Sequence, residues 1–292
     1  MERIEEKEMK ISVIIPVYNR LQHLRASILC LMKQKVMPDE LIISDDGSSE
    51  KVLDYIEDLL ENVKFKIIHV YQEDKGFRKT RALNNAVRIS TGNLLIFCDQ
   101  DLIFGEDYIE KMKNSCTKEN FIMGVAGLTT ENEKKEILKK LEKETYTESI
   151  KNVSEKCFEE IEKRKNKEKI RILLKKLKIK KRGLKLVGMS YGLFKENYLK
   201  VNGYDEKYQN WGNEDDDFGN RLTVLGLEGK VLNTENPLLH LWHYFDPTKK
   251  QCGNDEYYYK VKKIIFKEKR YRCEYGIKNQ LENDEIMVNE LN

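Results

Sequence analysis

The strongest constraint on the fold is a regular alternation of apolar runs and helical patterns up to about residue 130. Apolar runs predict strands at 11–17, 41–44, 65–70, 93–98 and 121–127. Amphipathic spacing between them predicts helices at 21–34, 51–60, 79–90 and 106–116. Strands that are apolar on both faces and separated by helices form parallel sheets with helices on both sides. The chain is therefore predicted to be an α/β protein.

A second region, from Thr130 to Arg182, contains neither Gly nor Pro and is dense in Lys and Glu. Leu and Ile recur in it at helical intervals, which predicts one or two long, exposed helices inserted into the fold. The globular pattern returns after Gly183. Residues from Asp255 onward are predicted to be helical at first, and the final dozen residues to be frayed or disordered. These changes divide the chain into 1–129, 130–183, 184–250 and 251–292.

Composition narrows the class of protein. The 53 basic and 50 acidic residues nearly cancel, so global charge does not indicate nucleic-acid binding. The six cysteines show no metal-binding spacing, which favours reduced thiols in a cytoplasmic setting. The charged N-terminus has no apolar signal core, and no apolar run is long enough for a transmembrane helix.

Two carboxylates, Asp99 and Asp101, follow directly after a predicted buried strand. Paired hard oxygen ligands at a strand end indicate Mg²⁺ or Mn²⁺ carrying a phosphate-bearing substrate. A simple strand-ending turn is the alternative. Such a metal usually takes another protein ligand, and we favour His243, at the end of a late apolar run. His240 in the same run is the fallback.

Polar residues also end the two neighbouring predicted strands. Asp45 and Asp46 end one of them, and Pro16 and Tyr18 end the other. Ligands of parallel sheets bind beyond the carboxyl ends of the strands, where a carboxylate can accept from a uracil or ribose group. Tyr18 can stack on a base. Turn formation and helix capping explain the same aspartates, and a loop anchor explains Tyr18.

The predicted helix 79–90 begins with basic residues. Arg78 and Lys79 follow Gly76, and Asn84 lies further along the helix. Helix dipoles favour acids at this end, so an anionic ligand such as a phosphate would explain the basic side chains. A solvated helix start explains them equally well.

Four consecutive acids, 214–217, follow Trp211 and Gly212. Adjacent exposed carboxylates repel one another by about 0.3–1 kcal/mol per pair, so a folded core gains nothing from them. Trp211 can form an aromatic wall, and Gly212 leaves the backbone accessible. The combination suits a site that holds a sugar and removes a proton from it.

A helix start explains the same acids, because carboxylates satisfy free amide groups there. Asn213 would be the N-cap. The two interpretations are compatible if Glu214 and Asp215 face the site. Asp216 or Asp217 would then cap the helix or form a structural pair.

In this order the motifs resemble family 2 glycosyltransferases of the GT-A fold. The matching segments are 13–19, Asp45-Asp46-Gly47-Ser48, Gly76-Phe77-Arg78 with Asn84, and Asp99-Gln100-Asp101. The segment 203–217 is similar to a galactosyltransferase-type module that also occurs in β-1,4-galactosyltransferases and chondroitin-polymerase-like enzymes. The resemblance covers residues 10–130 and 184–246.

The resemblance implies a Rossmann-like, mostly parallel sheet flanked by helices, a nucleotide-sugar donor, Mn²⁺ or Mg²⁺, and inversion at the anomeric carbon. The donor would contact Pro16, Tyr18, Asp45, Asp46, Arg78, Asn84, Asp99 and Trp211. The metal would be held by Asp99, Asp101 and His243. Asp215 would be the catalytic base, with Glu214 beside it, and the acceptor would contact Trp211, Gly212 and Glu214.

The predicted protein is a metal-dependent, inverting glycosyltransferase. It would use a UDP-sugar, with galactose or N-acetylgalactosamine favoured, and a glycan or lipid-linked acceptor in surface polysaccharide or glycoconjugate synthesis. Residues 1–129 would bind the donor, 184–250 the acceptor, and 251–292 would form a helical tail. The insertion 130–183 has no counterpart in the common module. The absence of a Gln-x-x-Arg-Trp motif favours single addition over polymerisation.

Three other classes of protein compete with this prediction, and the chain lacks a motif expected of two of them. A sugar-nucleotide pyrophosphorylase would carry a Gly-rich phosphate loop, and 16–21 contains no glycine. A dehydrogenase would carry G-x-G-x-x-G, which is missing. A protein that binds sugar nucleotides or glycans without turnover is the third alternative.

The insertion suggests a partner. Its last part carries no acid among the basic residues Arg171, Lys175, Lys176, Lys178, Lys180, Lys181 and Arg182. Such a helix suits peripheral contact with an anionic membrane, at the inner face of the plasma membrane, and a lipid-linked acceptor. A solvated helix is the alternative.

Overall fold

The structure, a computed structural model, describes residues 9–244 and 253–292. The strands are β1 (Ile11–Val17), β2 (Glu40–Asp45), β3 (Lys66–Gln72), β4 (Leu94–Cys98), β5 (Leu102–Ile103), β6 (Asn120–Met123), β7 (Ala126–Leu128), β8 (Ser190–Phe194), β9 (Glu228–Val231), β10 (Leu238–His240) and β11 (Ile286–Glu290). The helices are α1 (Leu21–Met32), α2 (Leu53–Leu60), α3 (Lys79–Ile89), α4 (Tyr108–Ser115), α5 (Glu131–Leu141), α6 (Tyr146–Ser149), α7 (Glu155–Lys176), α8 (Lys195–Lys200), α9 (Glu214–Leu225) and α10 (Asp255–Glu268).

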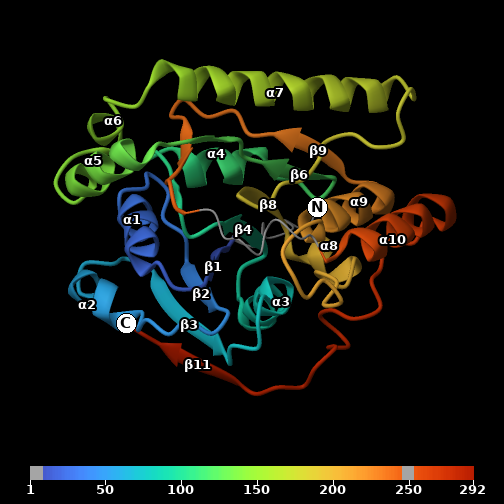
Figure 1. Cartoon of the computed structure of the whole chain (residues 1–292), viewed down its shortest axis with the longest axis horizontal. Helices are drawn as coiled ribbons and strands as arrows, with labels where there is room; N and C mark the ends of the chain where they lie inside the picture. Colours follow the sequence, from blue (N-terminus) through green and yellow to red (C-terminus); the bar gives the residue numbers. More distant parts are fainter. Residues whose placement is uncertain (1–8, 245–252) are drawn as a thin grey trace, which may run out of the picture.

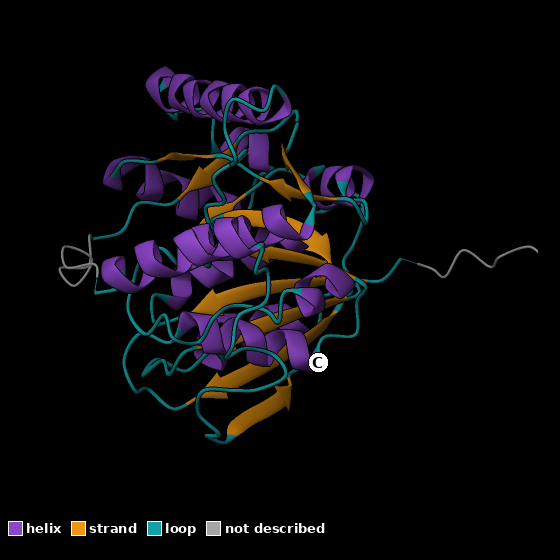
Figure 2. Ribbon diagram, turned by 90° about the vertical axis from the view of Figure 1, so that its right-hand side faces the viewer, coloured by secondary structure: helices purple, strands orange, loops and turns teal. Residues whose placement is uncertain are grey.

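Within the described residues, the strands form an eight-stranded sheet in the order β11-β3-β2-β1-β4-β8-β6-β9 and a small sheet in the order β5-β10-β7. Strands β3, β2, β1 and β4 are parallel neighbours, and their apolar residues are buried. Figure 1 shows α1 and α2 on one side of these strands and α3 on the other. Figure 2 shows the sheet as a twisted layer between helices. The expected α/β architecture is confirmed.

Parallel pairing brings the strand ends together. Val17 at the end of β1 is in register with Asp45 at the end of β2. On the other side of β1, Ile14 pairs with Phe97 of β4, so Asp99 follows at the same edge of the sheet. The carboxyl ends of β1, β2 and β4 therefore meet at one edge, as the sequence predicted.

One predicted strand is divided. The run 121–127 forms β6 in the main sheet and β7 in the small sheet. The chain leaves the first sheet at Gly124, where an added Cβ would lie 2.4 Å from the Ser190 side chain. Tight packing at this point requires glycine. The chain can therefore pass from β6 in one sheet to β7 in the other within a single apolar run.

The prediction for the C-terminus is wrong. The final dozen residues contain β11, which pairs antiparallel with β3 and places Val288 opposite Val70. Beyond the strand, Leu291 donates a backbone hydrogen bond of 2.9 Å to the carbonyl of Ile67. The edge of β3 offers unpaired backbone groups, and the C-terminal segment satisfies them although most side chains of β11 are exposed.

The prediction of one or two exposed helices in the insertion is also wrong in part. Three helices, α5, α6 and α7, form within its described residues, and each buries some side chains. Helix α5 begins with a capping box between Thr130 and Glu133 and buries Ile137 and Leu141. Helix α7 lies across the top of the molecule in Figure 1.

Among the described residues, no helix combines the length and apolar character that crossing a bilayer requires. The described cysteines are all free thiols, and Cys30, Cys98, Cys116 and Cys157 are buried. Cys252 lies outside the described residues.

Candidate active site

A cavity of about 450 Å³ opens at the shared edge of β1, β2 and β4. This volume lies in the range typical of small-molecule sites. The expected site residues that line it are Pro16, Tyr18, Asp46, Asp99, Asp101, Trp211, His240 and His243. They come from five separated stretches of the chain.

The loop after β1 is held by Gln100, the middle residue of the Asp-x-Asp turn. Its side-chain oxygen accepts from the backbone amide of Tyr18 at 2.9 Å, and its nitrogen donates to the carbonyl of Asn19 at 2.9 Å. Asn19 and Arg20 have positive φ angles of 52° and 55°. Gln100 thus locks a strained loop onto the turn that carries Asp99, a role that sequence analysis missed because a lone Gln carries no distinctive signal.

The two aspartates after β2 face different ways. Asp46 lines the cavity and accepts from the Gln72 side chain at 2.6 Å and from the backbone amide of Arg78 at 2.7 Å. Burial raises the pKa of Asp46 to about 7, against the effect of these hydrogen bonds. Asp45 is buried outside the cavity lining, 2.9 Å from His69. It supports the turn rather than facing the cavity.

The two basic residues at the start of α3, Arg78 and Lys79, also face different ways. The Arg78 guanidinium is buried and bound by Glu282 at 2.6 Å and Asp284 at 2.8 Å, both from the C-terminal segment. Lys79 lines the cavity instead, with its ammonium 2.9 Å from Asp99. Sequence analysis expected Arg78 to contact the donor, but the structure ties it to the chain's own acids. Lys79, which was not among the expected donor contacts, lines the cavity in its place.

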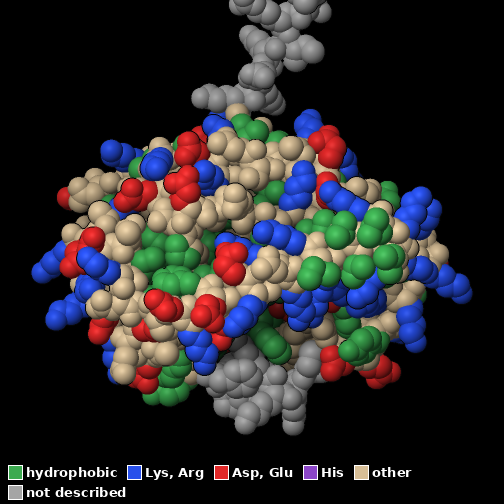
Figure 3. Space-filling view, turned by 90° about the horizontal axis from the view of Figure 1, so that it is seen from above, with side chains coloured by type: hydrophobic (Ala, Val, Ile, Leu, Met, Phe, Trp, Pro, Cys, Tyr) green, Lys and Arg blue, Asp and Glu red, His purple; other side chains and the backbone are tan. Residues whose placement is uncertain are grey.

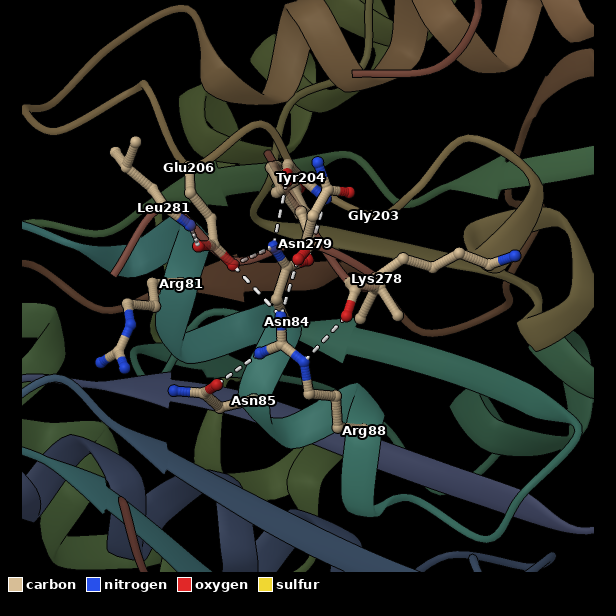
Figure 4. A network of polar contacts seen from close by, with 12 residues as sticks. Arg81, Asn84, Asn85, Arg88, Gly203, Tyr204, Glu206, Lys278, Asn279 and Leu281 are labelled. Atoms are coloured by element: carbon tan, nitrogen blue, oxygen red, sulfur yellow. Dashed lines mark hydrogen bonds and ion pairs between the residues drawn. The ribbon is translucent and has the colours of Figure 1, made fainter. Parts of the chain in front are cut away.

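Asn84 lies inside a polar network away from the cavity lining (Figure 4). Its side-chain nitrogen donates to Glu206 at 2.9 Å and to the carbonyl of Tyr204 at 3.0 Å. Its oxygen accepts from the Tyr198 hydroxyl at 2.8 Å and the Tyr204 amide at 2.9 Å. These bonds use the whole capacity of a buried amide. The expected donor contact of Asn84 is therefore corrected to a structural role.

Asp101 gathers both late histidines. The Nε2 atoms of His240 and His243 lie 3.0 Å and 3.3 Å from its two carboxylate oxygens. Strand β10 aligns His240 with Leu102, directly after Asp101, while His243 follows in the next loop. Sequence analysis treated His243 and His240 as alternatives. In the structure both imidazoles lie beside the same carboxylate.

The donor set fits a metal ion. The ligand atoms of Asp101, His240 and His243 all lie within 4.8 Å of one another. Oδ1 of Asp101 is buried and faces the Nε2 atom of His240, and the Nδ1 of His243 lies 2.8 Å from the carbonyl of Tyr244. That contact suits a neutral imidazole whose Nε2 lone pair is available. Asp99, an expected ligand, lies outside this group and pairs with Lys79.

The acids at the start of α9 fall into two pairs. Asp216 is bound by Arg182 at 2.7 Å and by the hydroxyl of Tyr258, and Asp217 is bound by Arg221 at 2.7 Å. These two are structural, as one interpretation of the sequence expected. Asn213 precedes the helix, but its side chain makes no capping hydrogen bond and donates to Asp255 at 2.7 Å.

Glu214 and Asp215 lie beside the cavity. Together with Asp99 they act on Lys79, and although burial works against it, the three carboxylates raise the pKa of Lys79. Asp215 is half-buried and accepts from the Tyr204 hydroxyl at 2.8 Å and the Gly188 amide at 3.0 Å. Burial and the charge of Asp215 raise the pKa of Glu214 to about 7. Lys79 therefore links the strand-end acids to the helix-start acids.

Gly212 and Trp211 complete this side of the site. Gly212 has a φ of 110°, which favours glycine, and its amide donates to the Glu214 carboxylate at 2.8 Å. Trp211 lines the cavity with a side chain that is 39% exposed. An accessible aromatic face beside a carboxylate suits sugar contact.

This parallel sheet, with carboxylates at its strand ends and an acidic helix start across the cavity, has the architecture of GT-A glycosyltransferases. The chain belongs to glycosyl transferase family 2, whose family model matches residues 12–185, more than half of the chain. A model described as the N-terminal domain of galactosyltransferase matches residues 168–243. The first match extends through the insertion, beyond the boundary at residue 129 that the sequence suggested.

Curated relatives agree with this class. Validoxylamine A glucosyltransferase of Streptomyces hygroscopicus subsp. limoneus is 25% identical over 74% of this chain and 48% of its own length. Chondroitin synthase of Escherichia coli is 25% identical over 73% of this chain and 32% of its own length. The chain thus spans about half, or less, of the relatives it matches.

Solved structures share the fold. S. aureus TarS 1-349 in complex with UDP-GlcNAc aligns with a TM-score of 0.57 at 15% identity, covering 87% of this chain and 64% of that TarS fragment. Mannosyltransferase PcManGT from Pyrobaculum calidifontis, in complex with GDP-Man and Mn²⁺, aligns with a TM-score of 0.52 at 12% identity. The alignment covers 82% of this chain and 58% of the mannosyltransferase. These alignments support the fold that membership of the family implies.

Proposed function

We propose that this protein transfers a sugar from a UDP-sugar to a glycan or lipid-linked acceptor, with inversion, in surface polysaccharide or glycoconjugate synthesis. Galactose or N-acetylgalactosamine is favoured because of the match to a galactosyltransferase domain. The observation that carries the proposal is the junction at Lys79. It joins a cavity lined by Tyr18, Asp46 and Asp101 to the carboxylates of α9.

The donor half is assigned to residues 1–129. Tyr18 is 48% exposed on the cavity wall and offers a ring for the base, while Asp46 offers a buried carboxyl for the nucleoside. Pro16 lines the cavity beside them. Lys79 brings a positive charge to the place where a diphosphate would lie.

Asp101, His240 and His243 would hold the metal, and two imidazoles beside a carboxylate favour Mn²⁺ over Mg²⁺. When bound, such an ion neutralises charge on the donor diphosphate. The Mn²⁺ in the mannosyltransferase neighbour supports this choice. Asp99 would contribute through Lys79 or by changing partner when the donor binds.

The acceptor half is assigned to residues 184–250. Asp215 takes the proton of the acceptor hydroxyl as that oxygen attacks the anomeric carbon, and the bond from this carbon to the diphosphate breaks. Tyr204 and Gly188 hold the Asp215 carboxylate in place. Glu214 and Trp211 contact the acceptor, and Gly212 leaves room for it. A base of this kind contributes about 10²–10⁴-fold to the rate.

The first test incubates the protein with a panel of nucleotide sugars and Mn²⁺, and measures released nucleoside diphosphate with and without a chelator. Chelator-sensitive release from one UDP-sugar supports the proposal and identifies the sugar. If no donor is hydrolysed, calorimetry with UDP and Mn²⁺ follows. Failure to bind UDP would overturn the donor assignment, whereas binding without turnover, even with added acceptor glycans, would favour a binding protein.

A further inference from the structure

The second half of α7 and the turn after it carry an exposed surface that the proposed reaction does not use. We call this the α7 end surface. It consists of Ile170, Leu173, Leu177 and Ile179 with Lys169, Lys178, Lys180 and Lys181. The four apolar side chains are 58%, 54%, 59% and 66% exposed, in the order given. Large apolar side chains gathered in this way on a surface mark an interaction site.

Helix geometry explains why these side chains point outward together. Ile170 and Leu173 lie on one face of α7, and Leu177, the C-cap residue four positions further on, continues that face. The opposite face buries Cys157, Ile161 and Glu168 against the body of the protein. The exposed apolar side chains of the α7 end surface therefore do not pack on the protein core beneath α7.

The same outward face changes character along the helix. In the first half it carries Glu155, Glu159 and Glu162, all exposed. From Lys169 to Arg182 the chain contains no acid. One helix thus presents a mixed-charge face at one end and an apolar, basic face at the other.

The lysines of the α7 end surface are available to a partner. Among the described residues, Lys169, Lys178, Lys180 and Lys181 are exposed and form no ion pair. Other basic residues nearby are engaged. Arg171 contacts Glu168, Lys176 lies 2.7 Å from Glu228, and Arg182 lies 2.7 Å from Asp216.

Figure 3 looks onto the side of the molecule that α7 covers. On its right, where the later half of α7 lies in Figure 1, hydrophobic side chains gather among Lys and Arg. A partner for this surface must accept apolar side chains and neutralise several positive charges at once.

We propose that the α7 end surface docks this protein on an anionic lipid bilayer. Apolar side chains enter the boundary between headgroups and acyl chains, and the lysines contact anionic headgroups. A second copy of the chain fits less well, because a two-fold contact would set the same lysines against one another. The inference is independent of the proposed sugar transfer and goes beyond it.

The experiment is sedimentation of the full chain with vesicles. One set is phosphatidylcholine alone, and the other contains about one third phosphatidylglycerol, enough to produce a strongly negative surface. The proposal expects binding to the anionic vesicles at least about tenfold tighter than to neutral ones, and weakened in about 0.5 M salt, which screens exposed charges. Equal binding to both sets, or none to either, would overturn it.

Two variants locate the contact. Leu173→Ser/Leu177→Ser removes exposed apolar side chains, and Lys178→Gln/Lys180→Gln/Lys181→Gln removes exposed charges. Each is expected to weaken binding to anionic vesicles by roughly tenfold or more. Because all five side chains are exposed, thermal unfolding should be unchanged.

Matched controls carry the same changes elsewhere. Leu53→Ser/Met287→Ser removes side chains that are 45% and 57% exposed on α2 and β11. Lys64→Gln/Lys139→Gln/Lys143→Gln removes the same charge from other exposed positions. The controls are expected to bind like the original protein. Equal losses of binding in the controls and the α7 variants would show that net charge and total exposed apolar area, not this surface, govern binding.

Self-association is tested in the same series. Sedimentation velocity without lipid is expected to show no change of mass between the original protein and Leu173→Ser/Leu177→Ser. A dimer that this variant dissolves would overturn the lipid proposal and assign the surface to a second copy.

Discussion

The strand-end acids, Asp99 and Asp101, line the cavity, whereas the helix-start acids, 214–217, do not, and the two groups of neighbouring carboxylates have different partners. At the strand end, Asp101 faces two imidazoles, while Asp99 faces the ammonium of Lys79. At the helix start, Asp216 and Asp217 each have an arginine, and Glu214 and Asp215 share the distant charge of Lys79.

The difference shows that the partner, not the spacing in sequence, decides what a carboxylate can do. The pKa of Asp101 is lowered, because His240, Arg20 and His243 outweigh the effect of burial. The pKa of Glu214 is raised, because burial and Asp215 outweigh Lys79. Burial therefore has opposite outcomes at these two carboxylates, because Asp101 has cationic partners beside it and Glu214 has a like charge beside it.

The largest expected effect is the loss of sugar transfer when Asp215, a member of the helix-start cluster, is replaced. Asp215→Asn removes the proposed base but keeps its shape, so sugar transfer should fall by about 10²–10⁴-fold. UDP affinity, measured by calorimetry, should stay nearly unchanged. Loss of UDP binding together with turnover would contradict the assignment of Asp215 as the base.

Two residues further along, the same substitution should act on stability. Asp217→Asn leaves the buried guanidinium of Arg221 without its 2.7 Å partner. Removing one partner of a buried ion pair costs about 3–5 kcal/mol of unfolding free energy. Urea unfolding would measure this loss, and a change below about 1 kcal/mol would contradict the pairing. Asp217→Leu with Arg221→Met should restore part of the stability.

The strand-end pair can be separated by metal affinity. Asp101→Asn should weaken Mn²⁺ binding by at least about tenfold, because it removes the charge that faces both imidazoles. Asp99→Asn should have a smaller effect, since Asp99 faces Lys79. Titration calorimetry with Mn²⁺ measures both variants. Equal losses would place Asp99 in the metal site after all.

The smallest effect is a pH dependence of stability at the helix start. The pKa of Glu214 is about 7 in the folded protein, against 4.5 for an unperturbed Glu, so between these values the folded state holds one more proton. Stability therefore falls as pH rises through this window and levels off above it. Glu214→Gln should remove up to about 1.4 kcal/mol per pH unit of this slope.

Urea unfolding at several pH values measures that slope. Asp46 also has a pKa of about 7 and contributes in the same direction, so Asp46→Asn is the matched comparison. An unchanged slope in Glu214→Gln would contradict the raised pKa of Glu214.

Local patterns predicted the elements that fold by local rules. Strands β1 to β4 and helices α1 to α4 form near the expected residues, because their apolar periodicity matches their burial. The pattern could not show that 121–127 serves two sheets, since that depends on packing at Gly124 against Ser190. Nor could it place β11, because the apolar run 286–288 is short and the strand forms only by pairing with the distant β3.

The sequence also predicted some, but not all, of the residues that line the cavity. The sequence placed Asp46, Asp101 and His243 at one cavity through strand ends and a family resemblance. It expected Arg78 at the cavity, but Glu282 and Asp284, about 200 residues away in the chain, hold that guanidinium. Lys79, one residue on, takes the cavity position.

By itself the sequence determined the parallel sheet, the edge at which its polar residues meet, and the family. These follow from apolar periodicity and from motifs that are each local in the chain. The tertiary structure decided which member of each adjacent pair faces the cavity: Asp46 rather than Asp45, and Lys79 rather than Arg78. It also brought His240 and His243 to one carboxylate. Such choices depend on partners from distant segments, and only folding brings those segments into contact.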